Sequence, residues 1–177
     1  NVFFANAGNN RMTAIGSNNL FVASDGNDDM LAIGGGNIAI MGGGKNTALL
    51  VGGNANLVQA GSGDDRVIAL SQSNVMVLGD GNNTVGALGG GGNLVWTGSG
   101  NDTVISLGLY AGNILMLGDG NNLAISGGRA NIIFCGSGRD SVLSVGQYNL
   151  VSTANGIDNV ISIGEYNLVH TGGDDDI

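Results

Sequence analysis

The sequence predicts an all-β fold, a parallel β-solenoid with about 18 residues per coil and nine to ten coils. Three observations predict it. Asn or Asp recurs at nine-residue intervals, an apolar residue follows two positions later, and two kinds of glycine turn alternate along the chain. Residues 136–170 show the pattern plainly, because Asp140, Asn149, Asp158 and Asn167 are each followed two residues later by valine. A fixed period of this kind is the signature of a repeat architecture.

We number each nonapeptide so that the Asn or Asp is position 6. Three of the intervals are ten or eleven residues, with insertions near Gly53, Gly90 and Ala111, and the others are nine. Position 8 is always apolar. Position 6 is filled by Asn10, Asn19, Asp28, Asn37, Asn46, Asn56, Asp65, Asn74, Asn83, Asn93, Asp102, Asn113, Asn122, Asn131, Asp140, Asn149, Asp158, Asn167 and Asp176.

The two turns define the elements of one coil in order. A Gly-x-Gly-x-Asp/Asn turn, as at 61–65 and 98–102, precedes one strand, and a Gly-x-x-Asn turn, as at 34–37 and 146–149, precedes the other. Glycine permits the positive φ that a chain reversal needs, and the four or five residues after each turn are rich in Val, Ile and Leu, as strands are. Two turns and two strands close one coil, and stacking pairs each strand in parallel with the strand 18 residues further on.

Position 8 is the predicted inward column, and position 7 separates the two faces. After Gly-x-Gly turns position 7 is mostly polar, as at Arg11 and Thr84, whereas after Gly-x-x-Asn turns it is always aliphatic, as at Ile38 and Leu94. Two interpretations stay open. Either a wide turn breaks the strict alternation of side chains, or the second face is apolar on its outside and packs on something in the parent protein.

The composition excludes several classes of protein. The 177 residues include 35 glycines and no proline, and their net charge of −9 argues against nucleic acid or anionic membranes as partners and favours cations. The lone Cys135 excludes an internal disulfide. No stretch of about 20 apolar residues and no signal peptide is present. Because the chain begins without methionine and stops inside a repeat, we expect residues 1–177 to be a single repeat region, a fragment of a longer protein.

The Gly-x-Gly-x-Asp turn followed by an aliphatic residue resembles the nonapeptide of the repeats-in-toxin (RTX) family, and the combination with Gly-x-x-Asn resembles the 18-residue C-terminal repeats of multifunctional autoprocessing RTX toxins. The resemblance implies Ca²⁺ as cofactor, type I secretion, folding outside the cell, and a role in virulence through engagement of a host cell surface or membrane and delivery of effector domains. Carried over by position, the implied calcium ligands are Asp28, Asp65, Asp102, Asp140, Asp158 and Asp176.

The chain departs from that family pattern in one respect. Over most of the Gly-x-Gly turns Asp alternates with Asn at position 6, so we expect fewer or weaker calcium sites, partly supplemented by Asp25, Asp80 and Asp119 at position 3. The last coil, with three consecutive aspartates, is the richest in carboxylates, but Asp174 replaces the turn glycine and threatens the turn.

Other residues favour structural roles. The unbroken asparagines after Gly-x-x turns predict a hydrogen-bonded amide ladder, with metal binding as the alternative. His170 and Cys135 are expected to be face and packing residues, and no catalytic set can be assembled, so we do not expect an enzyme.

Two competing functions remain. A calcium-independent structural or adhesive rod of a large bacterial surface protein would pack laterally through its aliphatic face. An accessory module of a polysaccharide-modifying enzyme would show exposed aromatic platforms.

Overall fold

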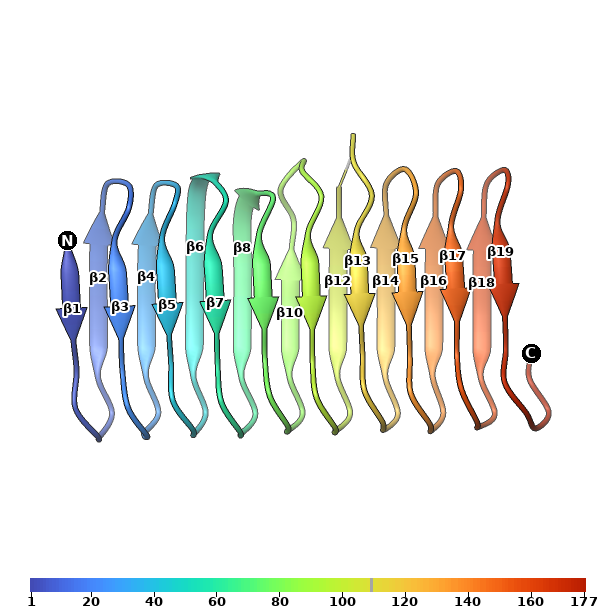
Figure 1. Ribbon diagram of the computed structural model, residues 1–177, viewed down its shortest axis with the longest axis horizontal. Coiled ribbons are helices and arrows are strands. Elements are labelled where there is room, and N and C mark those ends of the chain that lie inside the picture. Colours follow the sequence, from blue (N-terminus) through green and yellow to red (C-terminus); the bar gives the residue numbers. More distant parts are fainter. Residues whose placement is uncertain (109) are drawn as a thin grey trace.

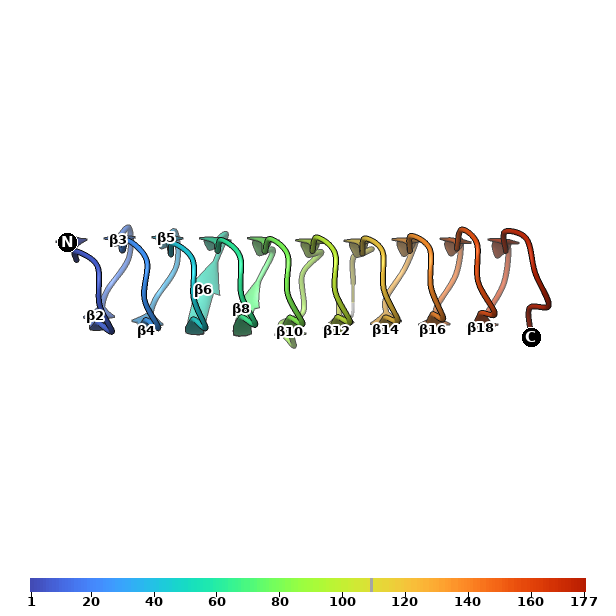
Figure 2. The same cartoon turned by 90° about the horizontal axis from the view of Figure 1, so that it is seen from below.

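The computed structural model describes residues 1–108 and 110–177, and over these residues the chain forms a β-solenoid of about nine turns with roughly 18 residues per turn. The coils stack along one straight rod with the two termini at opposite ends (Figure 1). Two parallel sheets face each other along its length (Figure 2). The predicted fold class is therefore confirmed. The described residues form no helix, and so none that is long and apolar enough to span a membrane.

Each coil contributes one strand to each sheet. The sheet of short strands contains β1 (Val2–Phe4), β3 (Leu20–Val22), β5 (Ile38–Ile40), β7 (Leu57–Gln59), β9 (Val75–Val77), β11 (Leu94–Trp96), β13 (Ile114–Met116), β15 (Ile132–Phe134), β17 (Leu150–Ser152) and β19 (Leu168–His170). The sheet of longer strands contains β2 (Arg11–Ile15), β4 (Asp29–Ile33), β6 (Thr47–Asn54), β8 (Arg66–Gln72), β10 (Thr84–Ala87), β12 (Thr103–Leu107), β14 (Leu123–Gly127), β16 (Ser141–Val145) and β18 (Asn159–Ile163).

The strand register follows the sequence period. Val142 in β16 pairs with Val160 in β18, which lies 18 residues further on, and the same offset recurs from coil to coil. The register shifts once, between Val51 and Asn54 in β6, which is the place of the insertion predicted near Gly53. An extra residue is thus accommodated as a local bulge at a turn, and the strands beyond it stay in step.

Side chains alternate strictly between the core and the surface. In β5, Ile38 and Ile40 are 39% and 38% exposed, whereas Ala39 between them is 1% exposed. Position 8 fills the core in both sheets, as predicted, with Val104 and Leu115 among its fully buried members. The interpretation in which a wide turn breaks the alternation is therefore wrong, and the aliphatic column at position 7 lies on the outside.

The second glycine of the Gly-x-Gly turn has a packing reason. Gly100 has a φ of 136°, and a Cβ at this position would overlap the carbonyl oxygen of Gly81 in the preceding coil. The turns therefore stack so closely that a side chain here is excluded by both backbone conformation and space.

The asparagines after the Gly-x-x turns form the predicted ladder. Asn113 donates its backbone N–H and its Nδ2 to the Oδ1 of Asn131, at 3.2 and 3.0 Å, and Ser126 Oγ donates to the same oxygen at 2.9 Å. Both asparagines are fully buried. Similar bonds link neighbouring coils from Asn19 to Asn167. This edge, which we call the asparagine edge, is therefore held together by its own amides.

Replacement of Asn131 by alanine should destabilise the rod strongly. The substitution leaves two buried N–H groups of Asn113 without their acceptor, so we expect the free energy of unfolding to fall by about 3 kcal/mol or more in urea titrations. Asn101→Ala is the matched control, because Asn101 Oδ1 accepts the backbone N–H of Asn121 at 2.7 Å on an exposed edge where water can replace it. Equal losses in the two variants would contradict the structural role of the buried ladder.

Candidate functional site

The opposite edge, which carries the Gly-x-Gly turns and which we call the glycine edge, holds most of the charge. Its basic residues are Lys45 and Arg139 alone, against 12 aspartates, which gives a formal net charge of −10. The asparagine edge carries one residue of each sign, Arg129 and Glu165. The aspartates of the glycine edge are Asp25, Asp28, Asp64, Asp65, Asp80, Asp102, Asp119, Asp140, Asp158, Asp174, Asp175 and Asp176.

The six aspartates that the sequence analysis singled out lie in one column along this edge. All of them except Asp176 are buried. Each Oδ1 accepts the backbone N–H of the residue at position 6 of the preceding coil. The donor is Asn46 for Asp65 at 2.8 Å, Asn83 for Asp102 at 2.8 Å, and Asp140 for Asp158 at 2.9 Å. One oxygen of each carboxylate therefore links two coils.

The coils with asparagine at this position show what the second side-chain atom does. Asn83 donates its Nδ2 to the carbonyl oxygens of Gly79 and Gly81 in its own turn, at 2.9 and 3.1 Å. Asn122 makes the same two bonds, to Gly118 at 3.0 Å and Gly120 at 3.2 Å. The amide thus closes the turn by supplying both donors that its carbonyls need.

In the aspartate coils an oxygen takes the place of that amide nitrogen. Oδ2 is buried and has no hydrogen-bond partner in Asp28, Asp65, Asp102, Asp140 and Asp158. A carboxylate oxygen and two carbonyl oxygens repel one another, and an unpaired buried charge is costly. Each such turn therefore requires either a proton on Oδ2 or a cation beside it.

The electrostatics of the aspartates reflect this burial. Burial raises the pKa of Asp65 from an ordinary value of 3.8 to about 6, against hydrogen bonds from Asn46 that lower it. Burial likewise raises the pKa values of Asp102 and Asp140, against hydrogen bonds from Asn83 and Asn122 respectively. The charged forms are thus disfavoured despite the bond at Oδ1.

A second feature of these turns escaped the sequence analysis. The buried residue at position 1, just before the turn, is small in the aspartate coils and large in the neighbouring asparagine coils. The small residues are Ala23, Ala60, Thr97, Cys135 and Thr153, and the large ones are Met41, Leu78 and Leu117. The hydroxyls of Thr97 and Thr153 are buried without partners. Reading position 1 two coils at a time would have revealed this pairing of small residues with aspartates.

The exposed acidic residues have another task. Asp80 and Asp119, predicted to supplement the calcium sites, accept the backbone N–H groups of Ser99 and Ser137 in the next coil, at 2.8 and 2.7 Å. Hydrogen bonds from Ser99 lower the pKa of Asp80. These carboxylates therefore cap backbone groups at the surface.

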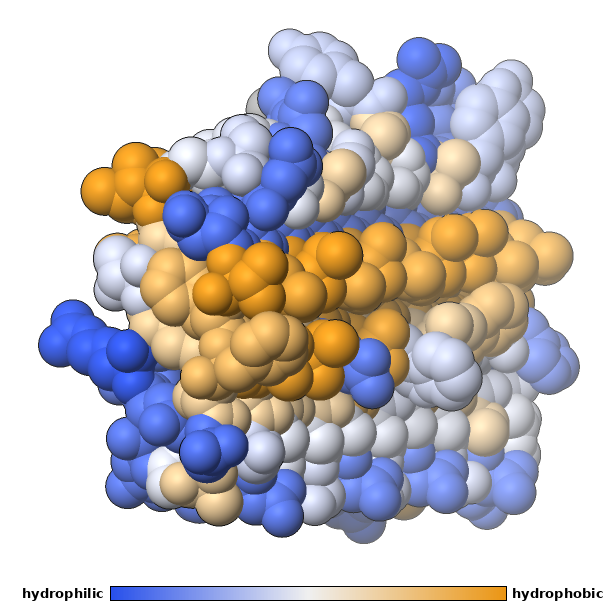
Figure 3. All heavy atoms as spheres, turned by 60° about the vertical axis from the view of Figure 1, so that its left-hand side comes forward, coloured by the Kyte–Doolittle hydropathy of each residue, from blue (hydrophilic) through white to orange (hydrophobic). Residues whose placement is uncertain are grey.

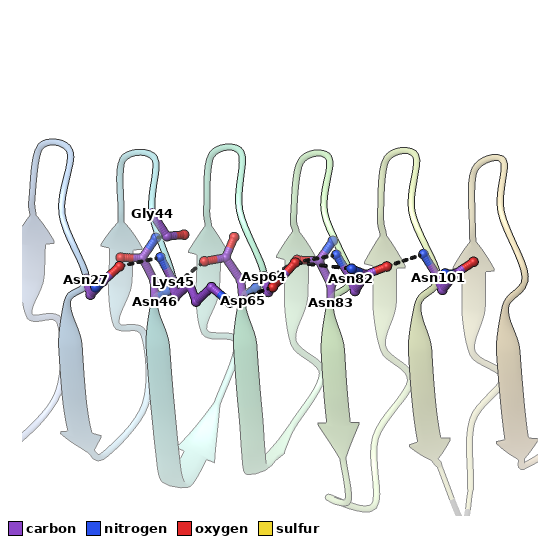
Figure 4. Close-up of polar contacts among 9 residues, drawn as sticks. All are labelled: Asn27, Gly44, Lys45, Asn46, Asp64, Asp65, Asn82, Asn83 and Asn101. Atoms are coloured by element: carbon purple, nitrogen blue, oxygen red, sulfur yellow. Dashed lines mark hydrogen bonds and ion pairs between the residues drawn. The ribbon is translucent and has the colours of Figure 1, made fainter.

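Position 5 forms a further exposed ladder, part of which Figure 4 shows. Asn82 donates its backbone N–H to Asp64 Oδ1 at 2.9 Å, and Asn101 donates to Asn82 Oδ1 at 2.8 Å. Lys45 Nζ and Asp64 Oδ2 form an ion pair at 2.8 Å. The outer side of this edge is therefore closed by hydrogen bonds even where its residues are acidic.

The structure brings the six aspartates into one column but not into one cluster. Asparagine coils separate Asp28, Asp65 and Asp102, and only Asp140, Asp158 and Asp176 occupy successive coils. The described residues contain no group of three or more His, Cys, Asp or Glu side chains placed to hold a metal ion. A cation here would therefore depend on turn carbonyls as well as carboxylates.

Two other predictions concern single residues. Asp174 takes a φ of 86° in the glycine position, and Asp158 still donates its backbone N–H to Asp176 Oδ1 at 3.1 Å, so the last turn keeps its form. Cys135 is buried, and this burial raises the pKa of its thiol, as expected for a packing residue. His170 lies exposed on β19, as expected for a face residue.

Comparison with known proteins adds no relative, since no family model, no curated protein and no solved structure matches the chain.

The buried aspartates predict an unusual dependence of stability on pH. Because the folded-state pKa of Asp65 is above the unfolded value, and those of Asp102 and Asp140 are raised too, protonation favours the folded chain. In metal-free buffer the thermal midpoint should therefore rise as the pH falls from 7 through 6 towards 4. The lowered pKa of Asp80 costs stability only below its unfolded value of 3.8.

A variant with Asp65→Asn, Asp102→Asn and Asp140→Asn should lose most of this rise and be more stable at pH 7, because each amide can close its turn as Asn83 does. A midpoint that falls steadily with pH in the unmodified chain would show that the buried carboxyls do not bind protons on folding.

Proposed function

We propose that this chain is a calcium-responsive repeat domain of a secreted bacterial RTX-type toxin. The fold supports a structural repeat domain, and the proposal of calcium binding is carried by one observation, the buried Oδ2 atoms that face turn carbonyls without a donor. Such oxygen-only surroundings on a strongly acidic edge suit a hard divalent cation.

The residues that would hold calcium follow from this arrangement. Oδ2 of Asp28, Asp65, Asp102, Asp140 and Asp158 would supply the charge, and carbonyls of the same glycine turns would supply neutral oxygens. When bound, the cation would neutralise the buried carboxylate and take the place of the amide donors. Asp140, Asp158 and Asp176 are the strongest set, because they place a carboxylate in three successive coils.

The response to calcium would arise from linkage. Without cations, repulsion along an edge of formal charge −10 opposes folding. A cation that binds only the folded turn stabilises it by mass action, by about 2.7 kcal/mol per site at a hundred times its Kd. A chain of this kind would fold less readily in a low-calcium cytosol than outside the cell.

Secretion by a type I system, contact with a host cell surface and delivery of effector domains are proposed from the family resemblance alone. The chain itself contributes the rigid repeat rod that such a role uses.

A structural or adhesive rod that folds without calcium is the second candidate. The observation that favours it is the number of bonds between coils that need no metal, namely the asparagine ladder and the Oδ1 caps of the aspartates. The sugar-binding alternative has less support. The exposed Trp96 and Phe134 lie beside aliphatic residues such as Ile114, which offer no polar groups to a sugar.

Calcium should stabilise the chain through the buried aspartates. In the presence of chelator we expect a weakened β spectrum by circular dichroism, and millimolar Ca²⁺ should restore it and raise the thermal midpoint by about 10 °C or more. The variant with Asp65, Asp102 and Asp140 changed to Asn should lose most of this increase.

The matched control changes Asp25, Asp80 and Asp119 to Asn, which removes the same charge from exposed caps and should keep the response. Asn83→Asp should add a response, since it opens a turn that the amide closes. A spectrum and midpoint that ignore calcium would instead support the metal-independent rod.

A further inference from the structure

The outer face of the short-strand sheet is apolar along its whole length. We call this surface the short-strand face. Its position 7 column is Val2, Leu20, Ile38, Leu57, Val75, Leu94, Ile114, Ile132, Leu150 and Leu168, and its position 9 column is Phe4, Val22, Ile40, Gln59, Val77, Trp96, Met116, Phe134, Ser152 and His170. None of these residues is Asp, Glu, Lys or Arg.

The apolar side chains of this face are substantially exposed. Trp96 is 54% exposed, Phe134 42% and Ile114 40%. Figure 3 shows the columns as orange bands that run along the rod, interrupted at few places. Sheets with a solvated face usually alternate apolar and polar residues, and contiguous apolar patches of more than a few hundred Å² mark interaction sites.

The shape of the face restricts its partner. The strands of this sheet stay in register, and the sheet runs straight without visible twist (Figures 1 and 2). Flat sheets of many strands are unusual and are typically stabilised by stacking or by side-chain ladders. A matching surface must be equally flat and must repeat at the strand spacing of about 4.8 Å. A second copy of the chain has both properties.

We propose that the short-strand face packs against the same face of a second copy of this chain, so that two rods lie side by side. Ten strands spaced about 4.8 Å apart and two residue columns roughly 7 Å apart give a face roughly 45 Å long and 12 Å wide. With the relief of its side chains, the area buried per copy approaches the ~800 Å² of a standard stable interface.

The distribution of charge selects the arrangement of the two rods. A two-fold axis along the rods places the glycine edge of each copy, with its formal charge of −10, over the nearly neutral asparagine edge of the other. The alternative two-fold axis, across the rods, would place both acidic edges together. The parallel arrangement is therefore favoured, and it sets each coil against the same coil of its partner, with Ile38 opposite the partner's Ile40.

This inference does not rest on the calcium proposal, because none of its residues belongs to the glycine edge. It is tested with the folded chain, verified by circular dichroism, in sedimentation equilibrium over a wide concentration range. The unmodified chain should form dimers. Ile114→Lys, which buries a charge at the middle of the interface, should weaken dimerisation by at least about 100-fold.

Thr103→Lys is the matched control, because Thr103 projects outward from β12 on the opposite sheet and the substitution adds the same charge. It should leave the dimer unchanged. A chain that stays monomeric at all concentrations overturns the proposal, and so does equal weakening by both lysines. A monomer that binds zwitterionic vesicles through Ile114 would overturn it in favour of a lipid surface.

The arrangement is tested by cross-linking in a Cys135→Ala background, since alanine occupies the equivalent position at residue 60. A mixture of Ile38→Cys and Ile40→Cys chains should be linked by a short bis-maleimide. Linkage of Ile38→Cys to Ile132→Cys chains instead would place distant coils together and overturn the parallel arrangement.

Discussion

The structure depends on one recurring hydrogen bond, in which a side-chain oxygen at position 6 accepts the backbone N–H of the same position in the preceding coil. Asn131 Oδ1 makes it on the asparagine edge and Asp102 Oδ1 on the glycine edge. It occurs at the corners, where the strand ladders end and backbone donors would otherwise be buried without partners. Because this bond requires one Asn or Asp per turn at a fixed place, it fixes the spacing of the coils and keeps all strands in register.

The second atom of the same side chain decides what each turn can do. As an amide nitrogen in Asn83 it closes the turn, whereas as Oδ2 in Asp102 it leaves three oxygens facing one another. The alternation of Asn and Asp keeps these open turns two coils apart over most of the rod, which limits repulsion between buried charges. The small residues that accompany the aspartates, such as Thr97 beside Asp102, show that the open turns differ from the closed ones in packing as well as in charge.

Much of this could be predicted from the sequence, because the fold is set by a short period. The spacing of Asp140, Asn149 and Asp158 with their following valines was sufficient to predict the coils, the pairing of Val142 with Val160 and the inward column. The orientation of the aliphatic position 7 was ambiguous, since it depends on whether the turns preserve strict alternation. The unpartnered Oδ2 atoms could not be predicted, because identical Oδ1 bonds form with Asn and Asp and only the geometry shows which turn carbonyls lack a donor.

The two surfaces that distinguish this rod are independent consequences of its straightness. Stacking without twist aligns twelve aspartates along one edge and twenty outward residues along the short-strand face, so charge and apolar area both accumulate in lines. Their separation matters physically. A face whose own column carried aspartates could not approach a second rod without desolvating charge, whereas here the acidic edge stays at the rim, where water and cations can reach it. Lateral packing and cation binding are therefore compatible on one chain.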